Sequence, residues 1–450
     1  MILKILLVAF GLTLSTYLFK KAAGTLSIRK LNIISYTFYL FVLQTYIGAS
    51  LVFLGDRKHY TMNYILHDKT ISTTFFFVFL TAILLPLMII ATHKLLRVDM
   101  EEVYNAYLEK DTQVDHEKII FYIVLLIASV CVLMMILLLI KIGYIPLIKL
   151  LHAEAGFNFK TERIIISNTV IINQYVKNIL ILSFIPVTSY ISFAYAVTTK
   201  KIRWIVLFIV LFGSSLIVKT YNFAKTPVVF YLFTFIILYI LINNGIKRLY
   251  MYIVVGGLSG IIALMYKVTG YVLTLSIHDG PISRIIFTQV GTLIYHFDLF
   301  PNSFPFLMGR SMSGTITNLL GLNLPHIRSA KIVMAFYGSR NVFDGIAGVM
   351  NAFFIGEAYA NFGVIGVLTS IAYMGILFGL IYYIFAKKIR KSALSVALFA
   401  ILTSDLAYAT QGGFFDFIYS SNIILIILLF VFINYSSKYL YKFINNNSLN

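Results

Sequence analysis

The stretch Ile119-Ile-Phe-Tyr-Ile-Val-Leu-Leu-Ile-Ala-Ser-Val-Cys-Val-Leu-Met-Met-Ile-Leu-Leu-Leu-Ile140 contains no charged residue. An apolar run of about 20 residues is long enough to cross the hydrocarbon core of a bilayer as a helix. Across all 450 residues, hydrophobic types make up 60% and charged types only 12%. The pattern predicts an all-α polytopic integral membrane protein, because a soluble chain of this length would divide into domains with polar surfaces.

Similar apolar blocks recur along the chain, separated by short polar segments. They cover 2–19, 32–54, 71–92, 119–140, 178–199, 204–218, 227–243, 249–266, 362–386, 393–410 and 421–437. We therefore expect about eleven transmembrane helices in a single integral domain, residues 1–450. The first block differs from a cleavable signal peptide because Lys20 and Lys21 follow its apolar run directly, which is typical of a retained helix whose far end is cytoplasmic.

Lys and Arg are concentrated in connections on alternate sides of successive blocks, and this pattern predicts the orientation. The connections concerned are 20–30, 93–118, 200–203, 247–248, 387–391 and the tail after 437. The positive-inside rule makes them cytoplasmic and places the amino terminus outside. They hold 19 of the 36 Lys and Arg, so the other 17 face at most 10 acidic residues. A basic outer surface suits an anionic ligand, although long loops also cross the membrane regardless of charge.

The interval 267–363 is too polar and too interrupted to be a membrane helix, and we expect it to be a long outer loop containing short helices. Pro301, Pro305 and Pro325 divide it. Its Arg and His residues are Arg284, Arg310, Arg328, Arg340, His278, His296 and His326. We expect any active site to lie here.

Several common catalytic motifs are absent from the sequence. There is no Gly-rich phosphate loop, no Cys/His cluster with metal-ligand spacing, no Asp-x-Asp pair and no Gly-x-Ser-x-Gly motif in the outer segments. The single cysteine, Cys131, can form no internal disulfide. We therefore expect neither cofactor nor metal, and no nucleic acid partner, so that the energy for any reaction would come from the substrate itself.

Arginines in the outer loop are the first candidates for a binding site. A guanidinium donates two hydrogen bonds to a phosphate and stays charged, which suits a site that holds a departing pyrophosphate. Arg310 follows Gly309, and a glycine there lets a ligand approach the backbone. Solvated or lipid-headgroup contacts are the alternative interpretation of each single arginine.

Glu357 and His296 are the candidates for proton transfer. Glu357 lies where the chain re-enters the membrane, a depth at which a carboxylate is costly unless it is paired or functional. A Glu–Arg pair that ties down the loop is the structural alternative. A histidine can act as a general base, but it is also common as a hydrogen-bonded structural residue.

The segment Phe353-Phe-Ile-Gly-Glu-Ala-Tyr-Ala-Asn-Phe-Gly363, with Phe300-Pro301 and Leu307-Met-Gly-Arg-Ser311 before it, resembles the Wzy-type O-antigen polymerases. The resemblance extends to the amino-terminal pattern and to the number of helices, and it implies an architecture like that of the GT-C glycosyltransferases. An Arg-x10-Gly pattern of that group is matched by Arg310 and Gly321. Arg163, in another outer segment, has no glycine at this distance.

This resemblance implies a bacterial inner-membrane enzyme whose active site faces the periplasm. It would join undecaprenyl-pyrophosphate-linked repeat units by metal-independent, inverting glycosyl transfer, with a polysaccharide chain-length regulator as a further partner. The implied binding residues are Arg310, Arg284, Arg328, Arg340, Arg163 and Tyr359, and the implied catalytic residues are Glu357 and His296. An O-antigen ligase and a lipid-linked oligosaccharide flippase are the two alternatives.

Overall fold

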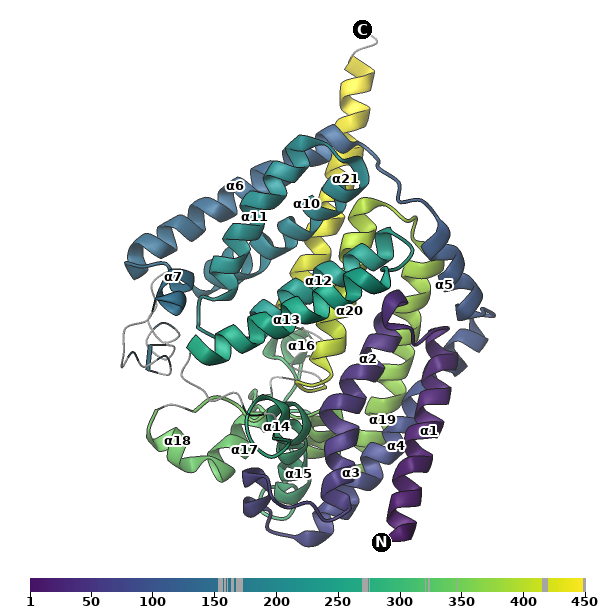
Figure 1. Ribbon diagram of the computed structural model, residues 1–450, viewed down its shortest axis with the longest axis vertical. Coiled ribbons are helices and arrows are strands. Elements are labelled where there is room, and N and C mark those ends of the chain that lie inside the picture. Colours follow the sequence, from purple (N-terminus) through teal and green to yellow (C-terminus); the bar gives the residue numbers. More distant parts are fainter. Residues whose placement is uncertain are drawn as a thin grey trace. The chain divides into compact units, whose positions relative to one another are not determined.

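The computed structural model describes residues 1–152, 157, 159, 161, 162, 166, 173–268, 274, 276–319, 321, 322, 324–345, 347–414 and 420–447 (Figure 1). Within these residues the chain is helical, and the one β-bridge pairs Gln113 with Ser392. Among the residues that the structure describes, nine helices are long and apolar enough to cross a membrane, and two shorter apolar helices match the remaining predicted blocks. The prediction of an all-α polytopic membrane protein is confirmed, whereas the number of crossings and the outer loop stay predictions.

The helices that correspond to the eleven apolar blocks are named here by their bounds. They are α1 (Ile2–Ala23), α2 to α3 (Ile33–Phe53), α4 (Asp68–Leu95), α6 (Glu117–Ile142), α9 to α10 (Gln174–Thr199), α11 (Ile202–Lys219), α12 (Thr226–Ile242), α13 (Arg248–Val268), α19 (Phe354–Tyr383), α20 (Ala393–Ala409) and α21 (Ser421–Asn447). Three of these runs include a π-helical turn: η2 (Val42–Tyr46), η4 (Lys177–Phe184) and, directly after α19, η6 (Ile384–Lys388).

Shorter helices lie between these blocks. They are η1 (Ile28–Lys30), η3 (Tyr60–Tyr64), α5 (Met100–Glu109), α7 (Pro146–Leu151), α14 (Pro281–Ser283), η5 (Arg284–Thr288), α15 (Gln289–Leu299), α16 (Gly314–Leu319), α17 (Ser329–Tyr337) and α18 (Ser339–Phe343). Between residues 276 and 353, the described part of the chain forms a series of short helices, in line with the prolines and glycines of this stretch.

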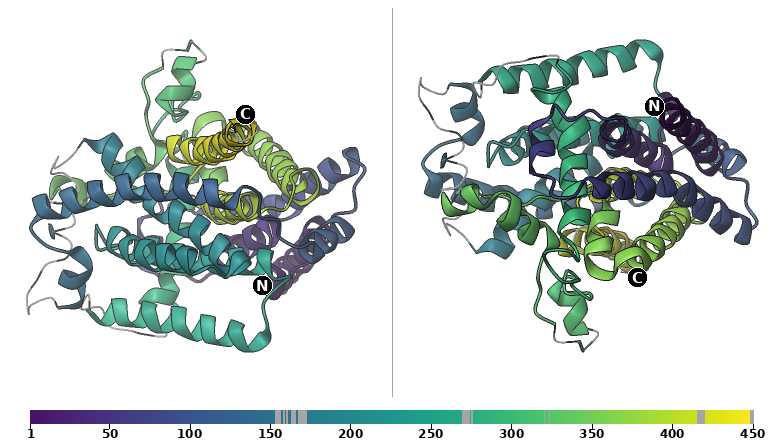
Figure 2. Two further views of the ribbon diagram at one scale, coloured as in Figure 1. Left: turned by 90° about the horizontal axis from the view of Figure 1, so that it is seen from above. Right: turned by 90° about the horizontal axis from the view of Figure 1, so that it is seen from below.

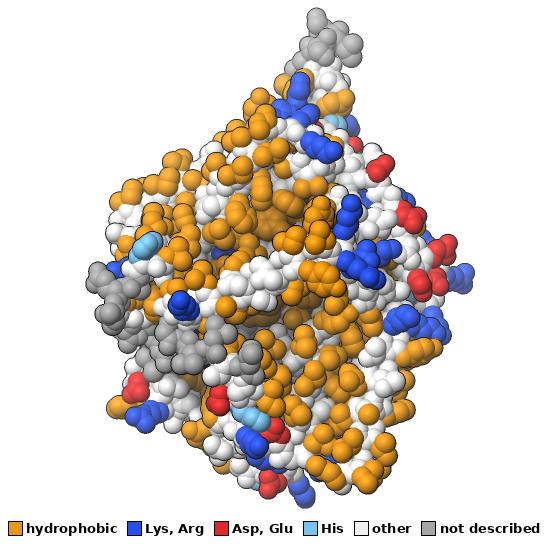
Figure 3. Space-filling view, in the orientation of Figure 1, with side chains coloured by type: hydrophobic (Ala, Val, Ile, Leu, Met, Phe, Trp, Pro, Cys, Tyr) orange, Lys and Arg blue, Asp and Glu red, His pale blue; other side chains and the backbone are white. Residues whose placement is uncertain are grey.

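The chain forms two compact units, each assembled from segments distant in sequence. Unit 1 comprises residues 1–105, 272–388 and 405–420, and unit 2 comprises 106–271, 389–404 and 421–450. In unit 1, α4 packs along α19 and α1 (Figures 1 and 2). Hydrophobic side chains cover the face of α1 in Figure 3, and Leu3 and Phe10 are among its exposed residues. An exposed apolar face of this kind fits a lipid environment.

Glycines explain how closely α4 and α19 approach. A Cβ added at Gly375 would lie 2.5 Å from the Cβ of Met88, and one at Gly379 would lie 3.1 Å from Thr92. Small residues at this spacing let neighbouring helices approach. The pair Gly256 and Gly260 on α13 has the same spacing, but no described atom lies within 4 Å of a Cβ added at either position.

The end of the run from α14 to α15 is a buried helix of unit 1. Every residue from Val290 to Leu299 is buried, and α15 packs against α4 and α19 inside unit 1. The apolar residues of this stretch therefore form part of the core of unit 1. This buried helix carries the polar side chains of Thr292, His296 and Asp298 into the interior.

Candidate functional site

Two segments of unit 1 that the sequence analysis singled out, 307–311 and 356–361, lie side by side. The Leu307 N–H donates to the Ala360 carbonyl at 2.9 Å, and the Met308 N–H donates to the Asn361 carbonyl at 3.1 Å. These carbonyls are available because α19 breaks at Phe362 and Gly363, where the backbone leaves helical geometry. A helix break leaves carbonyls without their usual N–H donors. Here the Leu307 and Met308 N–H groups take the place of those donors.

Glu357 is held in the interior of this junction. Its Oε1 accepts a hydrogen bond from the Ser311 hydroxyl, and its Oε2 accepts one from the Phe414 N–H. The Asn361 side-chain amide donates to the Ser311 Oγ at 2.6 Å and to the Glu357 carbonyl at 2.8 Å, and its Oδ1 accepts from the Gly309 N–H at 3.0 Å. Burying a carboxylate is tolerated when donors satisfy it in this way.

His296 lies on the helix that packs against the start of α19. A Cβ added at Gly356 would lie 2.9 Å from Leu293 and 3.5 Å from the Cβ of His296, so the glycine permits this approach. The His296 Nδ1–H donates to the Thr292 carbonyl at 2.8 Å, which leaves Nε2 as the basic nitrogen. Burial lowers the pKa of His296 to about 4. The imidazole is therefore neutral at pH 7 and is a weaker base than an exposed histidine.

A basic cavity of about 320 Å³ lies at the segment 326–331, which contacts the main chain of Arg310. It is lined by His326, Ile327, Arg328 and Lys331. The Ile327 N–H donates to the Arg310 carbonyl at 2.8 Å, and the main chain continues from Arg310 to Ser311, which holds Glu357. Cationic side chains around a cavity of this size could bind a phosphate or pyrophosphate group.

The other predicted binding residues are dispersed. Arg284, on η5, and Arg340, on α18, are exposed, and neither lines the basic cavity. Tyr359 is half-buried, and its ring stacks on Phe297 with 4.2 Å between ring centres, as part of the aromatic packing of α15 against α19. Arg163 lies outside the described residues.

Sequence reasoning missed the partners of these groups. Ser311, Asn361 and Lys331 received no role, although Lys331 lies on the first turn of α17, three positions after Arg328, the residue that precedes this helix. Asp298 was also missed. It is fully buried and accepts hydrogen bonds from the Leu66 and His67 N–H groups at 2.7 and 3.1 Å, near the start of α4. No pattern in the apolar run around it indicates this role.

All three histidines of the interval 267–363 have hydrogen-bond partners. His326 Nδ1 lies 2.7 Å from the Met312 carbonyl, and His278 Nε2 lies 2.8 Å from an oxygen of Asp56. Burial opposes the ionisation of Asp56, but hydrogen bonds from His278 and from the Lys58 N–H outweigh it and lower the pKa of this carboxyl. The His278–Asp56 pair thus joins two segments of unit 1 that are distant in sequence.

Comparisons with known proteins give no relative from which to assign a function. No family model, no curated protein and no solved structure matches the chain. Among the described residues, no group of three or more His, Cys, Asp and Glu side chains is placed to hold a metal ion.

Proposed function

We propose that this protein is a polymerase of lipid-linked oligosaccharides. Its substrates would be repeat units on undecaprenyl pyrophosphate, and its product a longer O-antigen or capsule-like polysaccharide. In this proposal the protein resides in the inner membrane of a bacterium, its active site faces the periplasm, and a chain-length regulator is a partner. The resemblance of residues 353–363 and 307–311 to the Wzy-type polymerases motivates the proposal.

One observation supports it most directly, the basic cavity at the segment 326–331. Its cationic groups, His326 when protonated, Arg328 and Lys331, come from one short segment. That segment is hydrogen-bonded to Arg310, within the motif that carries the resemblance. A pyrophosphate carries several negative charges, and permanent cations around it stabilise the further charge that develops as it leaves. The apolar helices fit a bilayer, in which the lipid tail of the substrate would remain.

The proposed reaction is a single displacement at the anomeric carbon of the growing chain. The acceptor hydroxyl, on the non-reducing sugar of a new repeat unit, forms a bond to that carbon. The bond between the carbon and the pyrophosphate oxygen breaks, the hydroxyl proton passes to a base, and undecaprenyl pyrophosphate leaves with the electron pair. Attack opposite the leaving group inverts the configuration. Arg310 and Arg328 would hold the pyrophosphate throughout.

The contacts support a positioning role for Glu357. Both of its carboxylate oxygens already accept hydrogen bonds, and the side chain is only 4% exposed. Ser311, which binds it, follows Arg310 directly, so Glu357 would fix the place of Arg310. His296 is the second candidate for the base, but its pKa of about 4 makes it a weak one.

Gel analysis of surface polysaccharide tests this proposal. Cells lacking the protein would be complemented with the wild type, Arg310→Ala or Arg328→Ala at matched expression. The expected result is loss of the ladder, with a single repeat unit still attached to lipid A core, in the deletion and in both variants. Arg57→Ala is the matched control, because Arg57 is an exposed arginine that makes only a 3.7 Å surface pair with Asp68. If no repeat unit reaches the core in the deletion strain, the protein acts in flipping or ligation and the proposal is wrong.

A further inference from the structure

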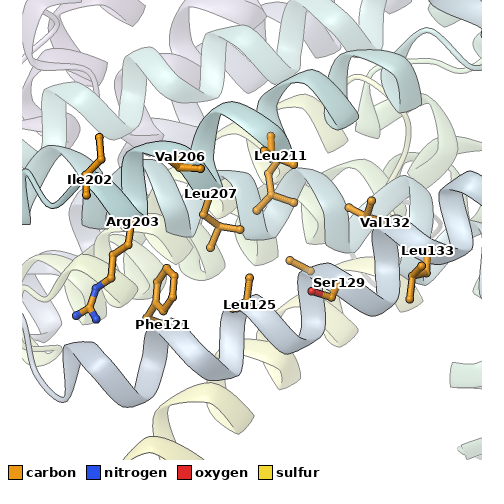
Figure 4. A pocket seen from close by; sticks show the side chains of 12 residues that line it. Phe121, Leu125, Ser129, Val132, Leu133, Ile202, Arg203, Val206, Leu207 and Leu211 are labelled. Carbon is orange, nitrogen blue, oxygen red and sulfur yellow. The ribbon is translucent and has the colours of Figure 1, made fainter.

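An apolar groove runs between α6 and α11 in unit 2 (Figure 4). Its volume is about 670 Å³, and its lining comprises Phe121, Leu125, Ala128, Ser129, Val132, Leu133, Ile202, Arg203, Val206, Leu207, Val210 and Leu211. Apart from Ser129 and Arg203, these side chains are apolar. Both helices are candidate membrane spans, so the groove belongs to a part of the protein that lies in hydrocarbon, where an acyl chain fills such a space better than water.

Positive charge gathers at one end of the groove. Figure 4 shows Arg203 beside Phe121 at that end, with Val132 and Leu133 at the other. The Arg203 guanidinium lies 5.0 Å from the centre of the Phe121 ring.

One acidic group partly offsets this charge. Glu117 binds Lys201 at 2.5 Å and also accepts hydrogen bonds from Arg203. Lys118 and Lys200, adjacent in sequence to this cluster, are exposed. The nearby Asp115 pairs with Arg390 at 3.1 Å. Four basic side chains therefore accompany one available carboxylate, and the groove's end carries a net positive charge.

We propose that this groove is a binding site for an anionic phospholipid. One acyl chain lies along α6 and α11, and the headgroup phosphate sits at Lys200, Lys201 and Arg203. A basic cluster at the end of an apolar groove matches the negative headgroup and the apolar acyl chain of such a lipid. The positive-inside rule makes this end cytoplasmic, whereas the proposed polymerase substrate binds on the outer side. The lipid site is therefore independent of the proposed function.

The chain contains one tryptophan, Trp204, and this residue reports on the groove. Trp204 is buried against Phe121, with 5.0 Å between ring centres. Purified full-length protein is reconstituted in phosphatidylcholine vesicles that contain increasing fractions of brominated phosphatidylglycerol or brominated phosphatidylcholine. Bromine atoms quench tryptophan fluorescence at short range, so the curves give the relative affinity of the two lipids. We expect phosphatidylglycerol to be preferred by about fivefold for each basic side chain that contacts it.

Variants of the groove and of its basic end, each with a matched control, test whether these residues cause the preference for phosphatidylglycerol. Ser129→Phe and Val210→Phe fill the groove from α6 and α11, whereas Leu126→Phe adds the same ring to a side chain of α6 that is 68% exposed and does not line the groove. The double variant Lys200→Gln, Lys201→Gln removes two of the positive charges proposed to contact the lipid headgroup, and it leaves the Arg203–Glu117 pair in place. Lys20→Gln with Lys21→Gln removes equal charge from unit 1.

The proposal requires that both groove-filling variants and the Lys200/Lys201 double variant lose most of the preference, while the two controls keep it. Equal quenching by the two lipids in the wild type would overturn it. So would an unchanged preference in Ser129→Phe and Val210→Phe, or an equal loss in Leu126→Phe, because either result places the selectivity elsewhere. Circular dichroism identifies a groove-filling variant that misfolds. If one of the two misfolds, the lipid preference of the other tests the proposal.

Discussion

Glu357 depends on a few individual hydrogen bonds, and the one from Ser311 can be removed alone. Ser311→Ala leaves the buried carboxylate with one donor fewer and takes an acceptor from Asn361. An unsatisfied buried polar group costs about 1–3 kcal/mol, so we expect a lower unfolding temperature by circular dichroism in detergent. The Ser313 hydroxyl is buried with no hydrogen-bond partner among the described residues, and Ser313→Ala should therefore have little effect. Equal unfolding temperatures for the two variants would show that the Ser311 contact is not stabilising.

Because His296 is buried in its neutral form, we expect the stability of the protein to fall as the pH is lowered. Its pKa is lowered to about 4 in the folded protein, against about 6.5 in an unfolded chain. Between these values the unfolded chain binds the proton and the folded protein does not, so the stability contributed by neutral His296 is lost as the pH falls from about 6.5 to about 4. His296→Gln removes this titration. The drop in unfolding temperature between pH 7 and pH 5 should be smaller in the variant than in the wild type, and an equal drop would contradict the burial of a neutral imidazole.

The sequence identified the chemical groups of this site better than their partners. Glu357 and Arg310 were predicted because a carboxylate in an apolar segment and an arginine after a glycine are unusual in themselves. Ser311 and the Phe414 N–H lie 46 and 57 positions from Glu357. Such contacts depend on where α19 breaks and on how the loop returns to it, and no local pattern carries this information.

At the scale of an element, the break in α19 is the feature that creates the site. Gly363 has φ +60° and ψ −141°, and an added Cβ would lie 3.0 Å from the Phe306 ring. We expect Gly363→Ala to cost about 1–3 kcal/mol through backbone strain and to weaken the pairing of 307–308 with 360–361. Gly260→Ala is the matched control, because open space surrounds Gly260 and alanine favours a helix by up to about 1 kcal/mol. Thermal unfolding compares the two, and a Gly363→Ala protein as stable as the control would argue against the strained geometry.

Helix positions were largely predictable, because every apolar block coincides with a helix and the predicted start at residue 362 falls at the break in α19. The continuation of α19 back to Phe354 was not predicted. Residues 354–361, apart from the half-buried Tyr359, are buried, and α15 and the 307–311 loop pack against them. Tertiary packing of this kind extends a helix beyond the boundary that hydrophobicity alone indicates.

For the whole molecule, the charge pattern makes a prediction about orientation. Cys131 is the only cysteine in the sequence and is buried, so single cysteines can be introduced into a background that is nearly silent to thiol reagents. Ser339→Cys on the exposed α18 should react with a membrane-impermeant reagent in intact spheroplasts. Ser27→Cys, in a predicted inner connection, should react only after permeabilisation. The reverse pattern would invert the topology and remove the basic cavity from the outer side.

We propose that the protein itself extends lipid-linked glycans and that its basic cavity holds the pyrophosphate. Incubation of the purified, reconstituted protein with undecaprenyl-pyrophosphate-linked repeat units alone, followed by mass spectrometry of the glycans, tests both parts of this proposal. We expect oligomers of two or more repeats, one undecaprenyl pyrophosphate released for each linkage formed, and loss of both products in Arg328→Ala but not in Arg57→Ala. Failure of the wild-type protein to form any linkage, while it remains folded and bound to the substrate, would rule the proposal out.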